Sequence, residues 1–384
     1  MKTLILWADA LRRSYVTKEN MPFLYKLSKT HGLVSIKPSF GFSQASWFTG
    51  VYPNKHGEFS TFKNGKNKIK TKLLKFIPNR LRPFAFNLIR YLKGNDYISH
   101  FIDVNKMDSF SLTREKYYHH NTLNIKTLFD YFKENNISYM IYYWPLIIEN
   151  GKTRLTLFTK GSDLAKTKKS IKLIRKTNHD VYFFHLSELD GFGHTYGPDS
   201  NQIKIKLREQ DWLIERLVRE FDPEKTNILI WSDHGMLPIK GLVNIEDNLP
   251  KNNRYLALIE STMAKFWFYD EEIKEEILAR LKKVKHGHIL SKAEQKKFNV
   301  DFKDNENYEE IFLADPGYLI FPNVFQNRPI KGAHGYDYSN KDELAVLITN
   351  KPTVRKQGNM VDMLPTILNL LKIKYDSIDG SSLV

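Results

Sequence analysis

An Asp-His pair follows a short apolar stretch in the second half of the chain. Asp233 and His234 come directly after the run Ile228 to Trp231 and precede Gly235. A carboxylate and an imidazole side by side can bind one divalent metal, and mixed oxygen and nitrogen ligation suits Zn²⁺ or Mn²⁺. In parallel α/β sheets ligands bind at the carboxyl ends of strands, so the position favours a site. Taken alone, an Asp-His-Gly sequence is more typical of a turn.

Four further carboxylate or imidazole groups occupy comparable positions. Asp9 follows the first apolar run of the chain, which begins almost at its N-terminus. Asp190 and His194 form an Asp-x-x-x-His cluster in a sequence that predicts a glycine-rich turn after another apolar run. His334 lies between small residues in a predicted loop. Six groups of this type, five of them just after predicted strands, favour one metal centre over six separate structural roles.

The order of these motifs resembles the alkaline phosphatase superfamily, in particular its type I phosphodiesterase and nucleotide pyrophosphatase branch. The stretches that carry the resemblance are Asp9–Arg12, Thr49–Gly57, Asp190–Pro198, Ser232–Gly235, Gly332–Gly335, Asp362–Leu368 and Asp379–Leu383. The resemblance implies two metal sites: Asp9, Asp233 and His234 with the nucleophile at one, and Asp190, His194 and His334 at the other. Two divalent ions, Zn²⁺ or alternatively Mn²⁺, would clamp the attacking and leaving oxygens of an in-line displacement. A serine phosphoryl-enzyme would be the intermediate.

The nucleophile is where the chain departs from the family pattern. In relatives, a Thr, Ser or Cys opens a helix nine residues before the threonine of a Thr-Gly pair, and here that position holds Phe40. Ser39 lies ten residues before Thr49 and needs a one-residue bulge, which Gly41 can absorb. Ser43 lies six residues before and requires a shift of nearly one helical turn. We therefore predict Ser39 at a helix start as the nucleophile, with Ser43 as the alternative.

Strand-like and helix-like segments alternate along the chain. Strands are predicted at 3–8, 33–37, 138–144, 180–187, 226–232 and 345–349, and helices at 20–30, 122–135, 162–176, 202–220, 272–284 and 359–371. This alternation predicts βαβ units and a three-layer α/β/α sandwich with a mostly parallel central sheet. We expect one catalytic domain over residues 1–384, with a basic insertion at 60–118 and a second at 240–330. The resemblance implies that such insertions cap the site, and solvated surface is the alternative.

Charge and composition restrict the partners. The 384 residues carry 59 Lys and Arg against 43 Asp and Glu, a net charge of +16, and this excess attracts polyanions. A basic and aromatic segment at 63–93 predicts contact with an anionic membrane surface, whereas nucleic acid is less favoured because no recognised motif is present. The chain has no cysteine, which excludes disulfides and thiolate metal sites. A short N-terminal apolar run and the lack of a long apolar stretch predict a cytoplasmic protein, with peripheral membrane attachment as the alternative.

Three functions are compatible with these residues. The favoured one is metal-dependent hydrolysis of a phosphoric diester or pyrophosphate in a nucleotide, a nucleotide-sugar or a lipid-linked phosphate. The second is a phosphomonoesterase, phosphonate hydrolase or phosphomutase with the same metal pair, which needs further positive charge over the third phosphate oxygen. The third is a non-catalytic basic binding protein. The complete set of six ligands disfavours this third function.

Overall fold

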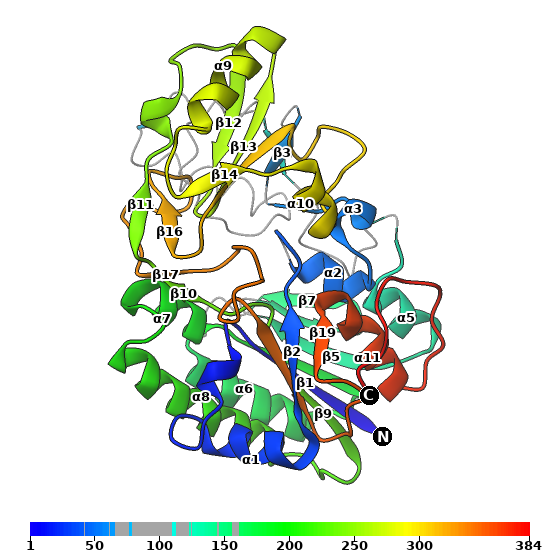
Figure 1. The fold of residues 1–384 in the computed structure, drawn as a ribbon. Coiled ribbons are helices and arrows are strands. Elements are labelled where there is room, and N and C mark those ends of the chain that lie inside the picture. The colour runs from blue at the N-terminus through cyan, green and yellow to red at the C-terminus, as the bar shows by residue number, and fades with distance from the viewer. Residues whose placement is uncertain are drawn as a thin grey trace.

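A nine-stranded sheet forms the centre of the computed structural model, which describes residues 1–41, 43–60, 62–65, 77–78, 110–112, 123, 125–143, 146–155 and 161–384 (Figure 1). In spatial order its strands are β19 (Gln357–Asn359), β2 (Leu33–Lys37), β18 (Ala345–Thr349), β9 (Thr226–Trp231), β1 (Lys2–Ala8), β8 (Val181–Leu186), β5 (Tyr139–Tyr143), β6 (Leu146–Glu149) and β7 (Lys152–Leu155). Strand β1 pairs in parallel with both β8 and β9. Only β18 and β6 run against the common direction.

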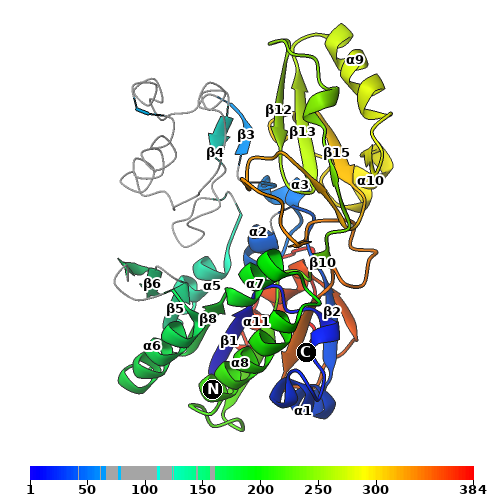
Figure 2. The same cartoon turned by 90° about the vertical axis from the view of Figure 1, so that its left-hand side faces the viewer.

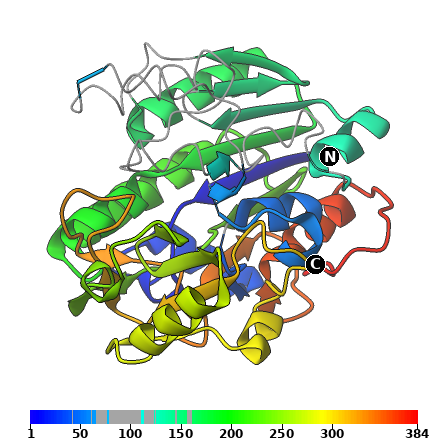
Figure 3. The ribbon, with the colours of Figure 1, turned by 90° about the horizontal axis from the view of Figure 1, so that it is seen from above.

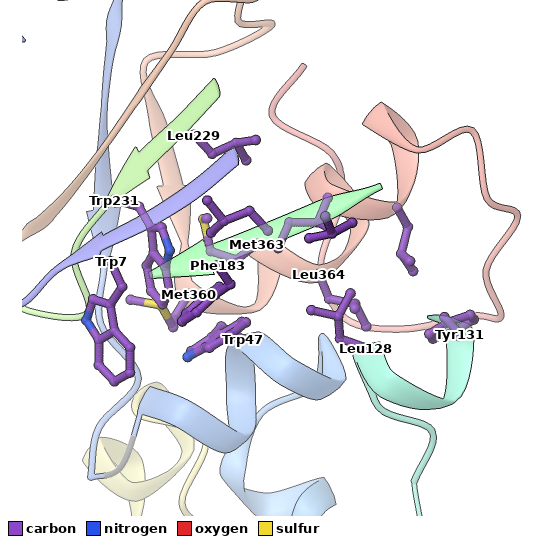
Figure 4. Close-up of a cluster of buried hydrophobic side chains, with 14 of the residues drawn as sticks. Trp7, Trp47, Leu128, Tyr131, Phe183, Leu229, Trp231, Met360, Met363 and Leu364 are labelled. Carbon is purple, nitrogen blue, oxygen red and sulfur yellow. The ribbon is translucent and has the colours of Figure 1, made fainter. Parts of the chain in front are cut away.

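Helices cover both faces of this sheet because its central strands are apolar on both faces. Alternate residues of β1 enter opposite cores: Leu4 and Leu6 pack on one side, Ile5 and Trp7 on the other. The first face carries α1 (Pro22–His31), α6 (Asp163–Lys176) and α8 (Asn201–Val218), and the second carries α2 (Ser43–Thr49), α5 (Leu128–Glu134) and α11 (Met363–Leu370). The second core is rich in aromatic rings, as Figure 4 shows for Trp7, Trp47, Phe183 and Trp231.

The predicted three-layer α/β/α fold is therefore confirmed, with differences at particular elements. The segment predicted as one helix at 359–371 contains the end of β19, a 3₁₀ turn (Met360–Asp362) and then α11. Pro365 lies in the first turn of α11, where its missing N–H costs no hydrogen bond. The helix predicted at 122–135 begins only at Leu128, because Thr127 and Asp130 form a capping box there. Residues 122 and 124 of that segment are outside the described part.

A smaller lobe lies beyond the carboxyl ends of the central strands (Figures 2 and 3). It contains a four-stranded antiparallel sheet with the order β12 (Tyr255–Ile259), β13 (Met263–Phe268), β15 (Glu310–Ala314) and β14 (Gly287–Ile289), together with α9 (Glu271–Leu281) and α10 (Lys292–Lys297). These elements fall within the insertion predicted at 240–330, where the only predicted element was the helix at 272–284, which corresponds to α9. Strand β15 gives no local signal because its partner β13 lies about fifty residues earlier, whereas β12 and β13 are neighbours in the sequence and were also not predicted.

The predicted basic insertion at 60–118 is mostly outside the described residues, and the segment 63–93 with it. Its described parts include β3 (Phe62–Asn64) and β4 (Phe110–Leu112), which pair with each other in antiparallel fashion. Contact of this segment with a membrane therefore stays a prediction. Within the described ranges, every helix is too short or too polar to span a lipid bilayer.

A buried imidazole anchors the helix that follows β2. His56, at the end of α3 (Pro53–His56), lies with Nε2 3.1 Å from Ser46 Oγ of α2, and its Nδ1 accepts the Glu58 N–H. Burial lowers the pKa of His56 from 6.5 to about 3. The unfolded chain therefore binds a proton first as the pH falls. Stability from this group is complete above pH 6.5 and is lost progressively toward pH 3.

We expect the free energy of unfolding to fall by about 2 kcal/mol between pH 7 and pH 5 through this group alone. The variant His56→Gln keeps hydrogen-bonding atoms but does not titrate. Its free energy of unfolding should therefore fall by about 2 kcal/mol less than that of the parent between pH 7 and pH 5. Urea denaturation of both proteins at the two pH values measures the difference. Identical pH dependence in the two proteins would contradict the assignment.

Candidate metal centre

Three neighbouring strands each lead to an acidic residue at the same edge of the sheet. Asp9 follows β1, Asp233 follows β9, and Asp190 lies in α7 (Glu188–Tyr196) directly after β8. Because the order β9–β1–β8 is parallel throughout, these carboxyl ends meet, and the three aspartates converge. His334 comes immediately after β17 (Gly332–Ala333). Strand β17 pairs with β10 (Leu237–Pro238), which begins shortly after His234.

The structure brings all six predicted ligands into one cluster. Ligand atoms of Asp9, Asp233 and His234 lie within 4.8 Å of one another, and so do those of Asp190, His234 and His334. His194 joins the second group, since its Nε2 is 3.3 Å from Asp190 Oδ1. The rings of His234 and His334 stack at a centroid distance of 3.5 Å. His234 thus lies between the two halves that the family resemblance separates.

Unpaired carboxylate oxygens show that this cluster is suited to cations. Two buried oxygens, Asp9 Oδ1 and Asp233 Oδ1, have no hydrogen-bond partner, and Asp190 Oδ1 has only the imidazoles of His194 and His334 near it, at 3.3 and 3.7 Å. Burial and the neighbouring charges of Asp233 and Asp190 raise the pKa of Asp9 well above its ordinary value. Buried charges of one sign are costly unless a counter-charge binds among them. The donor set therefore fits a pair of divalent ions held by oxygen and nitrogen.

The histidines are oriented for binding through Nε2. His194 Nδ1 donates to the Gly332 carbonyl at 2.8 Å, and His234 Nδ1 donates to the Gly235 carbonyl at 2.9 Å. A carbonyl only accepts, so each Nδ1 carries a proton, and Nε2 is the nitrogen that can bind a metal when it is deprotonated. Burial opposes protonation of His194, yet the adjacent Asp190 raises its pKa to about 9. The Asp190 carboxylate therefore favours positive charge at the site formed by Asp190, His194 and His334.

Asp190 and His194 lie on a helix, whereas the sequence predicted a glycine-rich turn. Their spacing places them on one face of α7, one turn apart. A buried network explains why a helix with two internal glycines forms here. Asp163 of α6 accepts the N–H groups of Ser187 and Glu188, which open α7, at 3.0 and 2.9 Å. Lys166, also buried, neutralises Asp163 at 2.5 Å and binds the Ser187 hydroxyl.

The two candidate serines line one small cavity beside this cluster. The cavity, about 20 Å³ in volume, is lined by Ser39 and Ser43 together with His234 and His334. Helix α2 begins at Ser43, four residues later than the helix start predicted at Ser39. The Ser43 hydroxyl lies 3.4 Å from the backbone carbonyl of Asp233, whereas buried Ser39 Oγ has no hydrogen-bond partner.

Phe40, at the family's nucleophile position, faces the smaller lobe. Its ring stacks on Phe298 at a centroid distance of 4.6 Å and is buried in the core of that lobe. Gly41 follows with φ +84°, a conformation that side chains disfavour, and an added Cβ would lie 2.4 Å from the Phe59 carbonyl. The chain thus turns sharply between the two serines.

One residue of the site was missed in the sequence. His185 of β8 lies opposite Trp7 in the sheet register, and its Nε2 is 3.0 Å from Asp9 Oδ2. The ring is held between Trp7 and Tyr143 at centroid distances of 4.1 and 4.7 Å. The sequence did contain a signal for this residue, because His185 lies near the end of the apolar run 181–186, where the predicted strand leads to the site. His185 orients the Asp9 carboxylate, as residues behind metal ligands commonly do.

Replacement of His185 by leucine should weaken metal binding about 10- to 100-fold, because Asp9 loses the donor that orients it. His185→Gln, which retains an N–H donor, should lose less. Competition with a chelating dye measures both affinities without substrate. An unchanged affinity in the leucine variant would show that His185 only fills space.

Comparison with known proteins places the chain in a family. The model of the type I phosphodiesterase / nucleotide pyrophosphatase family matches residues 3–337. Venom phosphodiesterase CdcPDE from Crotalus durissus collilineatus is 23% identical over 264 residues, which are 62% of this chain and 30% of that protein. GPI ethanolamine phosphate transferase 2 from Schizosaccharomyces pombe is 42% identical over 64 residues, 15% of this chain and 8% of that protein. The chain thus spans less than a third of the length of these curated relatives.

Solved structures show the same fold over nearly the whole chain. Human ectonucleotide pyrophosphatase / phosphodiesterase 5 aligns with a TM-score of 0.72 and 17% identity, covering 99% of this chain and 97% of that one. An inactive form of the murine protein in complex with AMP aligns with a TM-score of 0.71 and 18% identity, with the same coverage. From the family match, the chain belongs to the type I phosphodiesterase / nucleotide pyrophosphatase family.

Proposed function

We propose that the protein hydrolyses phosphoric diesters or pyrophosphates at a centre of two divalent metal ions. The observation that carries this proposal is the convergence of three aspartates and three histidines, in which buried oxygens of Asp9 and Asp233 have no hydrogen-bond partner. Asp9, Asp233 and His234 would hold one ion, and Asp190, His194 and His334 the other. When bound, the pair supplies positive charge that stabilises the phosphoryl group in the transition state and lowers the pKa of the attacking hydroxyl.

Zn²⁺ is the ion we expect, with Mn²⁺ as the alternative. Three imidazole nitrogens and three carboxylates form a mixed set that both ions accept, whereas Mg²⁺ prefers oxygen ligands alone. The ring orientations of His194 and His234 support this choice, because each presents Nε2 to the cluster. Metal analysis of the purified protein identifies the ion.

Ser43 is the nucleophile that the geometry supports better. Its hydroxyl is next to the Asp233 backbone, and it opens α2, whereas Ser39 lies beyond the turn at Gly41. The sequence favoured Ser39 because it lies ten residues before Thr49, close to the nine residues found in relatives. That count assumed that the helix ending at Thr49 is as long here as in the relatives. In the reaction the hydroxyl oxygen of Ser43 would bond to phosphorus as the bond from phosphorus to the leaving oxygen breaks, and the hydroxyl proton would pass to solvent. Water then hydrolyses the resulting phosphoserine ester and regenerates the hydroxyl.

The surroundings of Arg12 favour diesters over monoesters. A monoester presents a third charged oxygen, and Arg12 is the arginine nearest in sequence to Asp9. Its guanidinium, however, pairs with Asp199, donates to the Met236 carbonyl at 2.9 Å and lies over the Tyr15 ring. The group is buried and committed to these contacts, so it is not available to a phosphate oxygen.

The substrate class is proposed from the relatives. The AMP complex of the murine neighbour favours a nucleotide or nucleotide-sugar, whereas the match to GPI ethanolamine phosphate transferase 2 favours a lipid-linked phosphate. The net charge of +16 suits either anion. Attachment to an anionic membrane and a cytoplasmic location remain proposals from the sequence.

Parallel assays with bis-p-nitrophenyl phosphate and p-nitrophenyl phosphate test the function, each with and without a chelator. We expect faster turnover of the diester and loss of both activities on chelation. Preference for the monoester would favour a phosphomonoesterase, phosphonate hydrolase or phosphomutase. No turnover of either compound in metal-replete buffer would favour a binding protein.

A further inference from the structure

The two halves of the metal centre depend on two loops from distant parts of the chain. The His234 loop (residues 233–236) follows β9, and the His334 loop (residues 333–336) follows the first residue of β17. On one side, the pairing of β10 with β17 holds these loops together, with Leu237 opposite Ala333. That pairing is only two residues long, and the part of the His334 loop that follows Ala333 lies beyond it.

A buried carboxylate holds the far end of the His334 loop. Glu343 is 1% exposed, and its Oε1 accepts the N–H groups of Gly335 and Tyr336, the latter at 3.2 Å. These are the two residues that directly follow His334. Two N–H bonds to one carboxylate oxygen fix the backbone that carries the imidazole.

The main chain at the same position holds the His234 loop. The Glu343 carbonyl accepts the Gly235 N–H at 2.8 Å, and the Asp342 carbonyl accepts the Met236 N–H at 2.9 Å. This approach is so close that a Cβ on Gly235 would lie 2.0 Å from the Asp342 carbonyl oxygen. Residues 342 and 343 therefore contact both loops directly behind their histidines.

We propose that Glu343 is a positioning residue that fixes the His334 loop against the His234 loop and so sets the relation between the two metal sites. This role rests on the proposed metal centre, and Glu343 is not one of the six proposed ligands. The rings of His234 and His334, which these two loops carry, are stacked and lie 9° from parallel. Without the side chain of Glu343, the two N–H groups after His334 would lose their acceptor. The loop would keep the short β10–β17 pairing, the bond from Thr262 to the Gly335 carbonyl and the bond from the Tyr336 hydroxyl to the Tyr318 carbonyl.

A ligand role for Glu343 fits less well. Among the described residues, two sets of potential metal ligands have their ligand atoms within 4.8 Å of one another, and Glu343 belongs to neither set. The carboxylate lines the cavity beside His234 and His334, but its bonds go to backbone N–H groups. Oε2 has no hydrogen-bond partner, so an amide in place of the carboxylate would keep every bond that holds the loop.

Three variants separate positioning from charge and from general stability. Glu343→Ala removes the acceptor, and Glu343→Gln retains it without the charge. Asp211→Ala is the matched control, because buried Asp211 accepts two consecutive N–H groups, of Phe23 and Leu24, both at 2.9 Å, on the outer layer formed by α1 and α8. For each variant, Zn²⁺ affinity is measured by competition with a chelating dye, and the free energy of unfolding is measured in chelator.

We expect Glu343→Ala to weaken Zn²⁺ binding about 10- to 100-fold, as residues behind metal ligands typically do. Glu343→Gln should bind Zn²⁺ like the parent, and Asp211→Ala should lose stability but not affinity. Parental affinity in Glu343→Ala would overturn the proposal, and so would a glutamine variant as weak as the alanine one. These readouts need no substrate. If the parent binds Zn²⁺ but cleaves no phosphodiester, the proposed function fails while the role of Glu343 is still decided.

Discussion

Replacing Ser43 by alanine should remove nearly all phosphodiester turnover, a loss on the order of 10⁴-fold or more, because the attacking oxygen is gone. The Ser43 hydroxyl lies beside the Asp233 backbone, and Ser43 is the first residue of α2. Zn²⁺ affinity should change little by comparison, since the six principal ligands remain. Steady-state kinetics with bis-p-nitrophenyl phosphate and a dye-competition titration measure the two effects.

Ser39→Ala is the matched control for this experiment. Ser39 lines the same cavity, is also buried and forms no side-chain hydrogen bond, so its loss should reduce turnover far less. The reverse ranking would return the nucleophile to Ser39, as the sequence alone suggested. Equal and small losses in both variants would mean that water attacks phosphorus directly.

Replacing Asp233 by asparagine should lower metal affinity by at least about 100-fold, more than is typical of residues behind the ligands. Asp233 is buried at the end of β9, and its ligand atom lies within 4.8 Å of those of Asp9 and His234. In the metal-free chain the same replacement removes repulsion from Asp9, so the free energy of unfolding should stay equal or rise. Activity should fall with the metal.

The stability measurement is what distinguishes a ligand from a structural residue. Metal-free Asp233→Asn that unfolds more easily than the metal-free parent would show that the carboxylate holds the fold. Metal binding at parental strength would remove Asp233 from the site. Thr226→Ala offers a control on the same strand, because Thr226 is buried at the start of β9, at the opposite end from the cluster.

Much of the fold was readable in the sequence because the central strands are buried on both faces. The runs that form β1, β8 and β9 are nearly all apolar, and the predicted limits agree with the observed ones within about a residue or two. Their parallel order also explains why residues placed after separate strands converge. In the smaller lobe, β15 was missed because its partner β13 is distant in sequence, although β12 and β13 form a local pair.

The remaining differences have long-range causes as well. The glycines at 191 and 193 suggested a turn, but contacts from Asp163 of α6 to the start of α7 make this segment a helix. The position of Phe40 is set by Phe298, which no local pattern reveals. Likewise, the contact of His185 with Asp9 appears only when β8 and β1 are paired in register.

The most direct test of the account is a titration of the metal-free protein with Zn²⁺, with bis-p-nitrophenyl phosphate hydrolysis followed at each addition. The six ligands form two overlapping groups around His234, so we expect two equivalents of Zn²⁺ to bind per chain. Hydrolysis should be absent without metal and reach its maximum as the second equivalent binds. Full hydrolysis by the metal-free protein, or a protein that binds no Zn²⁺, would contradict the account.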